Sequence, residues 1–239
     1  MVKRLKYFSR KNGVLALVVL GLLGIVLYLI RWVGCARVVE PVETQEDNDY
    51  NNNNNNRRIL LLGDSILDNR MYVSSGKSVA DLLQKATQAK GYQVGLFAVD
   101  GATIRDVGSQ LNQIPMEYNT PETVIVLSVG GNDFLSGSEY GAAEQGYVSL
   151  VERIRKVFGE CKIYLVNLYR PVDPLFLIYY RIIDKWNLFL ERIVEKGFAD
   201  GVVDVFSVIS DPEDLVVKIE PSVVGGEKIV TAIVDQMEG

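Results

Sequence analysis

Short apolar runs alternate with longer amphipathic ones from Arg58 to the end of the chain, and this alternation is the strongest constraint on the fold. The short runs are rich in Val, Ile and Leu and predict strands, whereas the longer runs repeat their apolar residues with a helical period. Strict strand–helix alternation produces a parallel sheet with right-handed crossovers and helices on both faces. The sequence therefore predicts an α/β fold, a three-layer α/β/α sandwich around a five-stranded parallel sheet.

The expected strands are Ile59–Leu62, Gln93–Val99, Thr123–Val129, Lys162–Leu168 and Val202–Phe206. The expected helices are Ser78–Lys90, Ile104–Ile114, Glu144–Phe158, Leu175–Lys196 and Gly226–Met237. The third strand is apolar and β-branched throughout, which suits a central strand buried on both faces. Ligands bind outside the carboxyl ends of the strands in such sheets, so the residues that follow the strands are the candidates for a site.

Residues 13–30 form an uncharged apolar run that is about long enough to cross a bilayer as a helix. The basic residues in 1–12, with no acid among them, predict a cytoplasmic amino terminus and a domain on the exterior or lumenal side of the membrane. A cleaved signal peptide, or cleavage with lipidation at Cys35, is the alternative. We favour an uncleaved single-pass signal anchor because the run is long and continues into Arg31 and Trp32.

Residues 31–57 are acidic and end in a run of asparagines, which predicts a disordered linker before a domain at 58–239. The chain has a net charge of −5, although its first 37 residues contain basic side chains and no acidic one. The remainder is therefore strongly acidic, which argues against a nucleic-acid partner.

Four polar clusters follow the predicted strands, and each has two interpretations. Ser65 stands at a strand-to-helix turn, where its hydroxyl could act as a nucleophile or only cap a helix. Gly101 and Asn132 could donate hydrogen bonds to an oxyanion, or could serve as ordinary turn residues. Asp64, Asp133 and Tyr169 are expected beside them as substrate contacts. Glu220, before Pro221 and Ser222, belongs to the fourth cluster.

The chain contains no histidine, which excludes a Ser-His-Asp triad, a Cys-His pair and His-ligated metals. Phosphate-binding and dinucleotide-binding glycine motifs are absent as well. Asp64, Asp68, Asp133 and Glu220 could ligate a divalent cation, but acidic residues at strand ends more often serve as caps. We therefore expect neither a metal nor a cofactor.

The helix predicted at Leu175–Lys196 begins with an entirely apolar turn. Packing in the core is the simplest explanation of such a pattern. The turn also follows the loop that begins at Tyr169, so it should lie near the edge of the site. There it could form an acyl-binding wall or a lip that faces a membrane.

Taken in order, three of these clusters resemble the sequence blocks of the SGNH/GDSL hydrolase superfamily. Gly63-Asp64-Ser65-Ile66 resembles the first block, with Ser65 as nucleophile. Gly101 resembles the glycine of the second block, and Asn132, in Gly130-Gly131-Asn132-Asp133, the oxyanion donor of the third. The resemblance implies a flavodoxin-like sandwich, a serine esterase or acyl hydrolase, and a small-molecule ester, acyl or glycan ligand.

The last block departs from the family pattern Asp-x-x-His-Pro-Ser. Val217 stands where the Asp is expected and Glu220 where the His is expected, although Pro221 and Ser222 are in place. In a first hypothesis Glu220 is the base, with reduced or acid-shifted activity unless burial raises its pKa. In a second the domain is an inactive pseudoenzyme that binds a glycan or acyl ligand. In a third it is a scaffold in which Ser65 and Asn132 are only structural.

Overall fold

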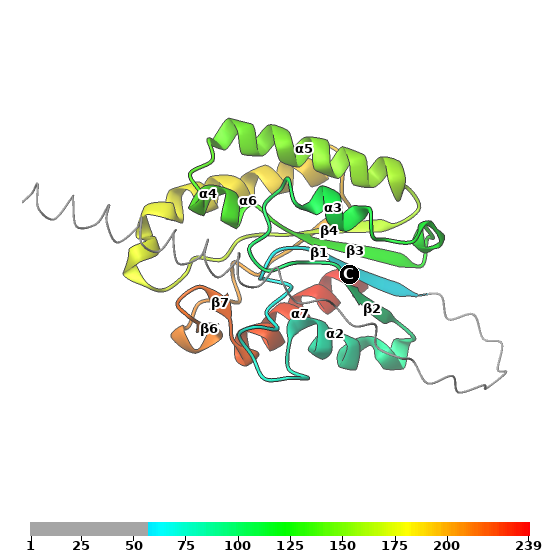
Figure 1. Cartoon of the computed structure of the whole chain (residues 1–239), viewed down its shortest axis with the longest axis horizontal. Helices are drawn as coiled ribbons and strands as arrows, with labels where there is room; N and C mark the ends of the chain where they lie inside the picture. The colour runs from blue at the N-terminus through cyan, green and yellow to red at the C-terminus, as the bar shows by residue number, and fades with distance from the viewer. Residues whose placement is uncertain (1–56) are drawn as a thin grey trace, which may run out of the picture. The chain divides into compact units, whose positions relative to one another are not determined.

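Five parallel strands form the central sheet in the order β2-β1-β3-β4-β5, which confirms the predicted sheet. The computed structural model describes residues 57–239 (Figure 1). Buried aliphatic side chains fill both faces of β1 and β3, which is why these strands lie at the centre. The strand bounds are β1 Arg58–Gly63, β2 Gln93–Leu96, β3 Thr123–Ser128, β4 Lys162–Val166 and β5 Gly201–Val203.

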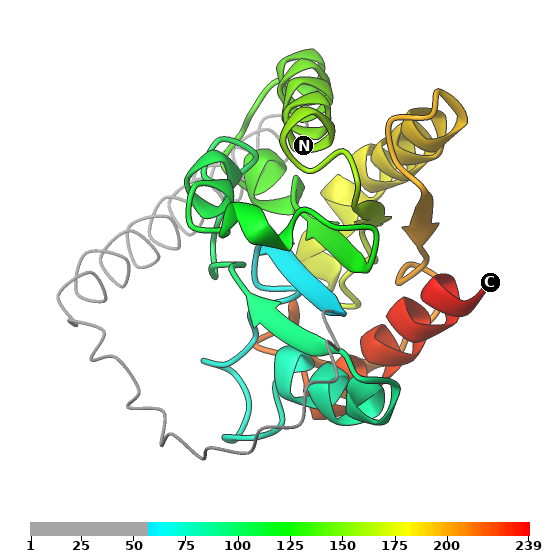
Figure 2. The same cartoon turned by 90° about the vertical axis from the view of Figure 1, so that its right-hand side faces the viewer.

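Helices cover both faces of the sheet, so the predicted three-layer sandwich is confirmed (Figure 2). On one face α2 and α7 pack against each other, and α3, α5 and α6 cover the other face. A short helix, α4, follows β3 directly, and a small antiparallel hairpin, β6–β7, precedes α7. The bounds are α2 Val79–Thr87, α3 Val107–Leu111, α4 Gly131–Leu135, α5 Tyr140–Val157, α6 Tyr180–Glu195, α7 Val223–Glu238, β6 Leu215–Val216 and β7 Glu220–Pro221.

Several element boundaries differ from the sequence prediction because side chains cap the chain locally. The helix expected at Ile104–Ile114 is shortened, since Asp106 accepts hydrogen bonds from the backbone N–H and hydroxyl of Thr103 and holds a turn there. Glu139 caps α5 by accepting from the N–H of Ala142, so this helix starts earlier than expected. The helix expected at Leu175–Lys196 is instead a 3₁₀ segment, η3 (Pro174–Tyr179), followed by α6. Sequence analysis did not predict α4 or the β6–β7 hairpin.

Aromatic packing fixes α4 against the rest of the domain. Trp186 of α6 is fully buried and makes edge-to-face contacts with Phe134 of α4 and Tyr147 of α5. Gly130 precedes α4 with a φ of 124°, and a Cβ there would lie 2.6 Å from the Trp186 ring. Glycine is therefore required at the point where β3 turns into α4.

Several of the sequence predictions fall outside the described residues. These are the basic segment 1–12, the transmembrane helix 13–30, the linker as far as residue 56, and the fate of Cys35. Between residues 57 and 239, no helix combines the length and the apolar character needed to cross a bilayer.

Candidate active site

Ser65 lies at the carboxyl end of β1, in a turn whose position is set by the neighbouring strand. Gly63 pairs with Ser128 at the end of β3, and the N–H of Asp64 donates to the Ser128 carbonyl at 2.9 Å. Gly63 has a φ of 119°, and a Cβ there would lie 1.6 Å from that carbonyl oxygen. Glycine is therefore obligatory before the turn, and the close approach of β3 places Ser65 beside α4.

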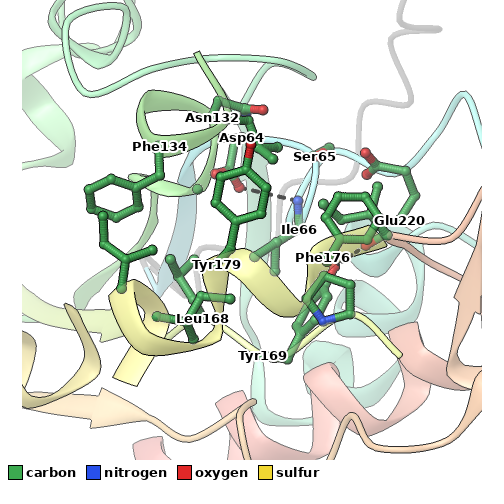
Figure 3. Close-up of a pocket in the computed structure, with 16 residues that line it drawn as sticks. Asp64, Ser65, Ile66, Asn132, Phe134, Leu168, Tyr169, Phe176, Tyr179 and Glu220 are labelled. Atoms are coloured by element: carbon green, nitrogen blue, oxygen red, sulfur yellow. Dashed lines mark hydrogen bonds between the residues drawn. The ribbon is translucent and has the colours of Figure 1, made fainter. Parts of the chain in front are cut away.

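Asp64 uses its carboxylate to hold the turn. Its Oδ1 accepts hydrogen bonds from the N–H of Ile66 at 3.2 Å (Figure 3) and from the hydroxyl of Ser128 at 3.0 Å. Burial raises the pKa of Asp64 to about 7, even though both hydrogen bonds lower it, and the charge of Glu220 adds to the rise. Asp64 lines the pocket, and these contacts suit a positioning role.

Asn132 and Asp133 tie α4 to the loop that follows β2. The Nδ2 of Asn132 donates to the carbonyl of Ala102 at 3.0 Å, and the Oδ2 of Asp133 accepts from the N–H of Ile104 at 3.0 Å. Asn132 lines the pocket with Ser65, so the second N–H of its amide is in reach of a group bound there. The carboxylate of Asp133 instead faces the loop.

Gly101 opens this loop, with a φ of 75° that suits glycine. It is exposed, and its N–H donates toward the carboxylate of Asp100, which offsets part of the rise that burial causes in the pKa of Asp100. The structure therefore brings Asn132 next to Ser65. It also ties α4 to the loop that contains Gly101. Donation from Gly101 to an oxyanion would require its N–H to leave Asp100.

Glu220 reaches the site from β7, and two side chains hold its backbone on either side. The hydroxyl of Tyr169 donates to the carbonyl of Ile219 at 2.5 Å. The Nδ2 of Asn69 donates to the carbonyl of Pro221 at 3.1 Å. Asn69 is completely buried and also accepts from the N–H of Val79. Sequence analysis did not identify Asn69, because nothing in a single sequence marks a polar residue as buried.

Burial, together with the nearby charge of Asp100, raises the pKa of Glu220 to about 7. The hydroxyl of Ser65 acts in the opposite direction, because its contact stabilises the ionised carboxylate. In Figure 3 the Glu220 carboxylate extends toward Ser65. The Oε2 of Glu220 is buried and has no hydrogen-bond partner among residues 57–239. The carboxylate thus retains a free acceptor in contact with the candidate nucleophile.

Val217 occupies the tip of the β6–β7 hairpin, where the family pattern has aspartate. Val217 and Lys218 both have positive φ values, 47° and 74°, which are unusual for residues other than glycine. The Val217 side chain is 72% exposed, whereas Lys218 pairs with Asp173 at 3.0 Å. The exposed Val217 therefore offers no replacement for the missing carboxylate.

A second polar group, not predicted from the sequence, lies beside Glu220. The hydroxyl of Tyr72 donates to Asp100 at 2.8 Å, and burial together with the charge of Glu220 raises the pKa of Tyr72. Asp68 pairs with Arg70 at 2.7 Å, so its charge is compensated. These contacts give the site a polar side made of Tyr72, Asp100 and Asp68.

The other side of the site is an apolar pocket of about 80 Å³. Asp64, Ser65, Asn132 and Glu220 form its polar end (Figure 3). Its apolar walls come from the segment after β4, from η3 and α6, and from α4; they include Phe134, Leu135, Leu168, Tyr169, Pro171, Phe176, Tyr179, Ile182 and Ile183. The apolar turn at the start of the predicted helix Leu175–Lys196 therefore does contribute to the wall of the site, and Tyr169 lines it as expected.

Solved structures share this fold at low sequence identity. TesA is 20% identical, with a TM-score of 0.62 over 76% of this chain and 98% of that chain. A mutant of Axe2, an acetyl-xylooligosaccharide esterase from Geobacillus Stearmophilus, is 19% identical, with a TM-score of 0.60 over 77% and 94%. A Clostridium thermocellum family 3 carbohydrate esterase is 18% identical, with a TM-score of 0.60 over 75% and 94%.

A comparison with curated protein sequences gives no significant match. The model of the GDSL-like lipase/acylhydrolase family matches residues 61–220, a region that runs from within β1 to Glu220. This match spans more than half of the chain and includes the Ser65 turn, Asn132 and the β6–β7 hairpin as far as Glu220. The chain belongs to the GDSL-like lipase/acylhydrolase family.

Proposed function

We propose that the domain is a serine ester hydrolase in which Ser65 is the nucleophile and Glu220 is the general base. The observation that carries this proposal is the partly buried Glu220 carboxylate, which extends toward Ser65 (Figure 3) and whose pKa is raised to about 7. A carboxylate with an ordinary pKa is a poor base at neutral pH, whereas one near 7 has the basicity that proton abstraction requires. Burial thus supplies what the missing imidazole would have given.

The proposed reaction begins when Ser65 Oγ attacks the ester carbonyl and its proton passes to Glu220. Asn132 stabilises the oxyanion through its free amide N–H, together with backbone donors of the Ser65 turn and, once its N–H has left Asp100, Gly101. Protonated Glu220 then returns the proton to the departing alcohol and leaves an acyl-serine. Water then attacks the acyl-serine while Glu220 takes its proton. As the bond to Ser65 breaks and the acid leaves, Glu220 gives that proton to Ser65 Oγ, so the enzyme returns to its starting state.

The size of the pocket supports a short acyl group as substrate. Since a single water needs roughly 10–15 Å³, the pocket of about 80 Å³ has room for roughly five to eight heavy atoms. The polar side formed by Tyr72, Asp100 and Asp68 suits a hydroxylated leaving group. The similarity in fold to proteins described as carbohydrate esterases is in keeping with such an alcohol.

Labelling with a fluorophosphonate ester probe between pH 5 and 9 tests the proposal. We expect labelling of the wild-type chain that is abolished in Ser65→Ala and strongly slowed in Glu220→Gln. Ser138→Ala and Glu191→Gln, which change exposed residues, are the matched controls and should label normally. Absence of Ser65-dependent labelling and ester turnover at every pH would contradict the proposal.

The alternative is a binding module that recognises a glycan or acyl ligand without turnover. The buried Oε2 of Glu220 favours it, because an unpartnered acceptor gains a hydrogen bond when a ligand hydroxyl arrives. A thermal-shift screen of acetylated and free sugars distinguishes the two functions. Stabilisation that disappears in Glu220→Gln or Asn132→Ala, in a protein without ester turnover, would favour the binding module.

We also propose that residues 13–30 anchor the chain in a membrane as a single-pass helix, with the amino terminus cytoplasmic and the domain on the other side. The support is the sequence: an uncharged apolar run preceded by basic residues. Alkaline carbonate extraction should leave the full chain in the membrane fraction. A protease added outside intact cells or vesicles should digest the domain and spare residues 1–12, and the reverse pattern would contradict this orientation.

A further inference from the structure

The outer face of η3 exposes several apolar side chains on an otherwise acidic domain. Its inward residues Phe176 and Tyr179 line the pocket. Its outward residues Leu175, Leu177 and Ile178 are 65%, 56% and 71% exposed. Single exposed apolar side chains are normal, but here three lie on one six-residue element at the wall of a pocket. We call Leu175, Leu177 and Ile178 the apolar lip.

The apolar lip is held in place at both ends. At its start Asp173 accepts from the N–H of Leu175 at 2.9 Å and pairs with Lys218 of the hairpin. At its end the hydroxyl of Tyr180 donates to the carbonyl of Pro171 at 2.7 Å. These contacts fix the orientation of η3, so the three side chains do not fold back into the core.

The charges around the lip favour a lipid surface. Residues 174–183 contain no acidic side chain, although the chain as a whole has a net charge of −5. Arg181 is the basic residue in this stretch, and Lys218 lies beside Asp173 at the adjacent hairpin tip. The acids that flank this stretch, Asp173 and Asp184, are paired with Lys218 and Arg170. An apolar surface whose flanking acids are compensated in this way, with a basic residue of its own, suits a segment that rests on lipid headgroups and acyl chains.

The linker between residues 13–30 and the domain is long enough for the apolar lip to reach the membrane. The described chain begins just before β1, at the amino-terminal ends of the strands, and the β6–β7 hairpin lies at the other end of the sheet, as Figure 1 shows. Residues 31–56, fully extended, span up to roughly 85 Å. A domain of this size is roughly 40 Å across. A chain anchored through residues 13–30 can therefore turn its pocket toward the bilayer.

We propose that the apolar lip rests on the lipid surface of the membrane that anchors the chain, so that the pocket takes an amphipathic acyl ester presented at that surface. This inference rests on the proposed anchoring and esterase function. Phe176 and Tyr179 then continue the lip into the pocket, so that an acyl group entering beside Ser65 stays in contact with apolar side chains.

The experiment places an environment-sensitive NBD fluorophore on Ile178→Cys or, separately, on Leu177→Cys. The full chain carries Cys35→Ser and is reconstituted into phosphatidylcholine–phosphatidylglycerol vesicles; Cys161 is buried and should remain unlabelled. The control is Met116→Cys, at an apolar residue that is 61% exposed. Met116 begins the 3₁₀ segment Met116–Tyr118 before β3, at the end of the sheet opposite to the pocket. We expect blue-shifted emission and quenching by doxyl-labelled lipids at positions 177 and 178, and neither at 116.

A replacement of the lip provides the second arm. Leu175→Ser combined with Leu177→Ser, with the label at 178, should weaken quenching by roughly tenfold or more, because the apolar area that enters the lipid is reduced. Equal quenching at 116 and 178, or no quenching at 177 and 178, would overturn the proposal. Blue-shifted emission without lipid quenching would also overturn it, because the lip would then be covered by protein, either residues 13–30 or a second copy.

The readout separates this inference from the proposals beneath it. Ser65→Ala should show the same quenching, so loss of ester turnover leaves the result at position 178 unaffected. Carbonate extraction reports separately whether residues 13–30 insert. If they do not, the same labelled chain is mixed with preformed vesicles, and lipid quenching at 178 still decides whether the lip contacts lipid.

Discussion

The hydroxyl of Ser65 faces the carboxylate of Glu220 at the polar end of an apolar pocket. The two residues come from segments that are far apart in the sequence. Ser65 is placed by the turn after β1, and Glu220 by a two-residue strand near the carboxyl terminus. Because burial raises the pKa of this carboxylate, its protonation changes in the pH range where proteins usually work. The predictions below follow from this pair and from the backbone that positions it.

Ester hydrolysis should increase as pH rises toward neutrality. Glu220 acts as a base only when ionised, and its pKa is about 7, so kcat/KM should increase about tenfold per pH unit below that value and level off above it. Initial-rate assays with a soluble short-chain ester, repeated across this pH range, would measure the profile. Glu220→Gln should lower kcat/KM by about 10²–10⁴ and remove the pH dependence. An optimum near pH 4 in the wild type would contradict the assigned role.

Asp100→Asn should move the rising limb of this profile to lower pH. The negative charge of Asp100 raises the pKa of Glu220, and its removal therefore makes the ionised carboxylate easier to form. The variant keeps the size of the side chain and an acceptor for Tyr72. Asp106→Asn, in the same loop, is the control for a loss of charge. A shift to higher pH in Asp100→Asn would show that another charge controls Glu220.

Glu220→Gln should stabilise the protein at pH 8 and leave its stability near pH 4 almost unchanged. A carboxyl group whose folded pKa is raised contributes stability below its unfolded pKa and loses it as pH rises through about 7. Removing the charge should therefore increase the free energy of unfolding at pH 8 by about 1–3 kcal/mol. Thermal melts of both proteins between pH 4 and 8 measure the difference. Glu191→Gln, at an exposed position of α6, should behave like the wild type throughout.

Gly63→Ala should be severely destabilising. Its Cβ would lie 1.6 Å from the Ser128 carbonyl oxygen, and its φ of 119° is unfavourable for alanine, so β1 and β3 must separate. We expect a loss of at least about 3 kcal/mol in the free energy of unfolding. Gly137→Ala is the matched control, because its φ is 83° but its Cβ would meet nothing within 4 Å. Urea denaturation should show a cost of only about 1 kcal/mol there.

Val217→Asn should stabilise the hairpin by about 1 kcal/mol, since asparagine tolerates a φ of 47° better than a β-branched residue does. Leu188→Asn, at an exposed apolar position of α6, should be neutral or destabilising and serves as the control. The same geometry bears on restoring the family residues. Glu220→His should respond little to an added Val217→Asp, because side chains at position 217 face solvent. A large further gain in esterase activity would mean that the hairpin rearranges.

Local patterns along the chain were enough to predict the five-stranded parallel sheet, most helices and the family. Strands such as Thr123–Ser128 are apolar on both faces, and the residues at the ends of three strands resemble the family blocks. The absence of histidine likewise meant that a residue of another type must act as the base. Glu220 was the candidate because it stands before Pro221, where the family pattern has histidine. These features depend on residues close together in sequence, which is why they could be read directly.

Only the tertiary structure decided how these residues act together. The buried Asn69 and Tyr169 fix the backbone beside Glu220, and burial next to Asp100 raises the pKa of its carboxylate. Asp133 was expected to contact substrate, yet its carboxylate holds the loop at Ile104. Desolvation and hydrogen bonds between distant segments exist only once the chain has folded, so the sequence named the residues and the fold set their chemistry.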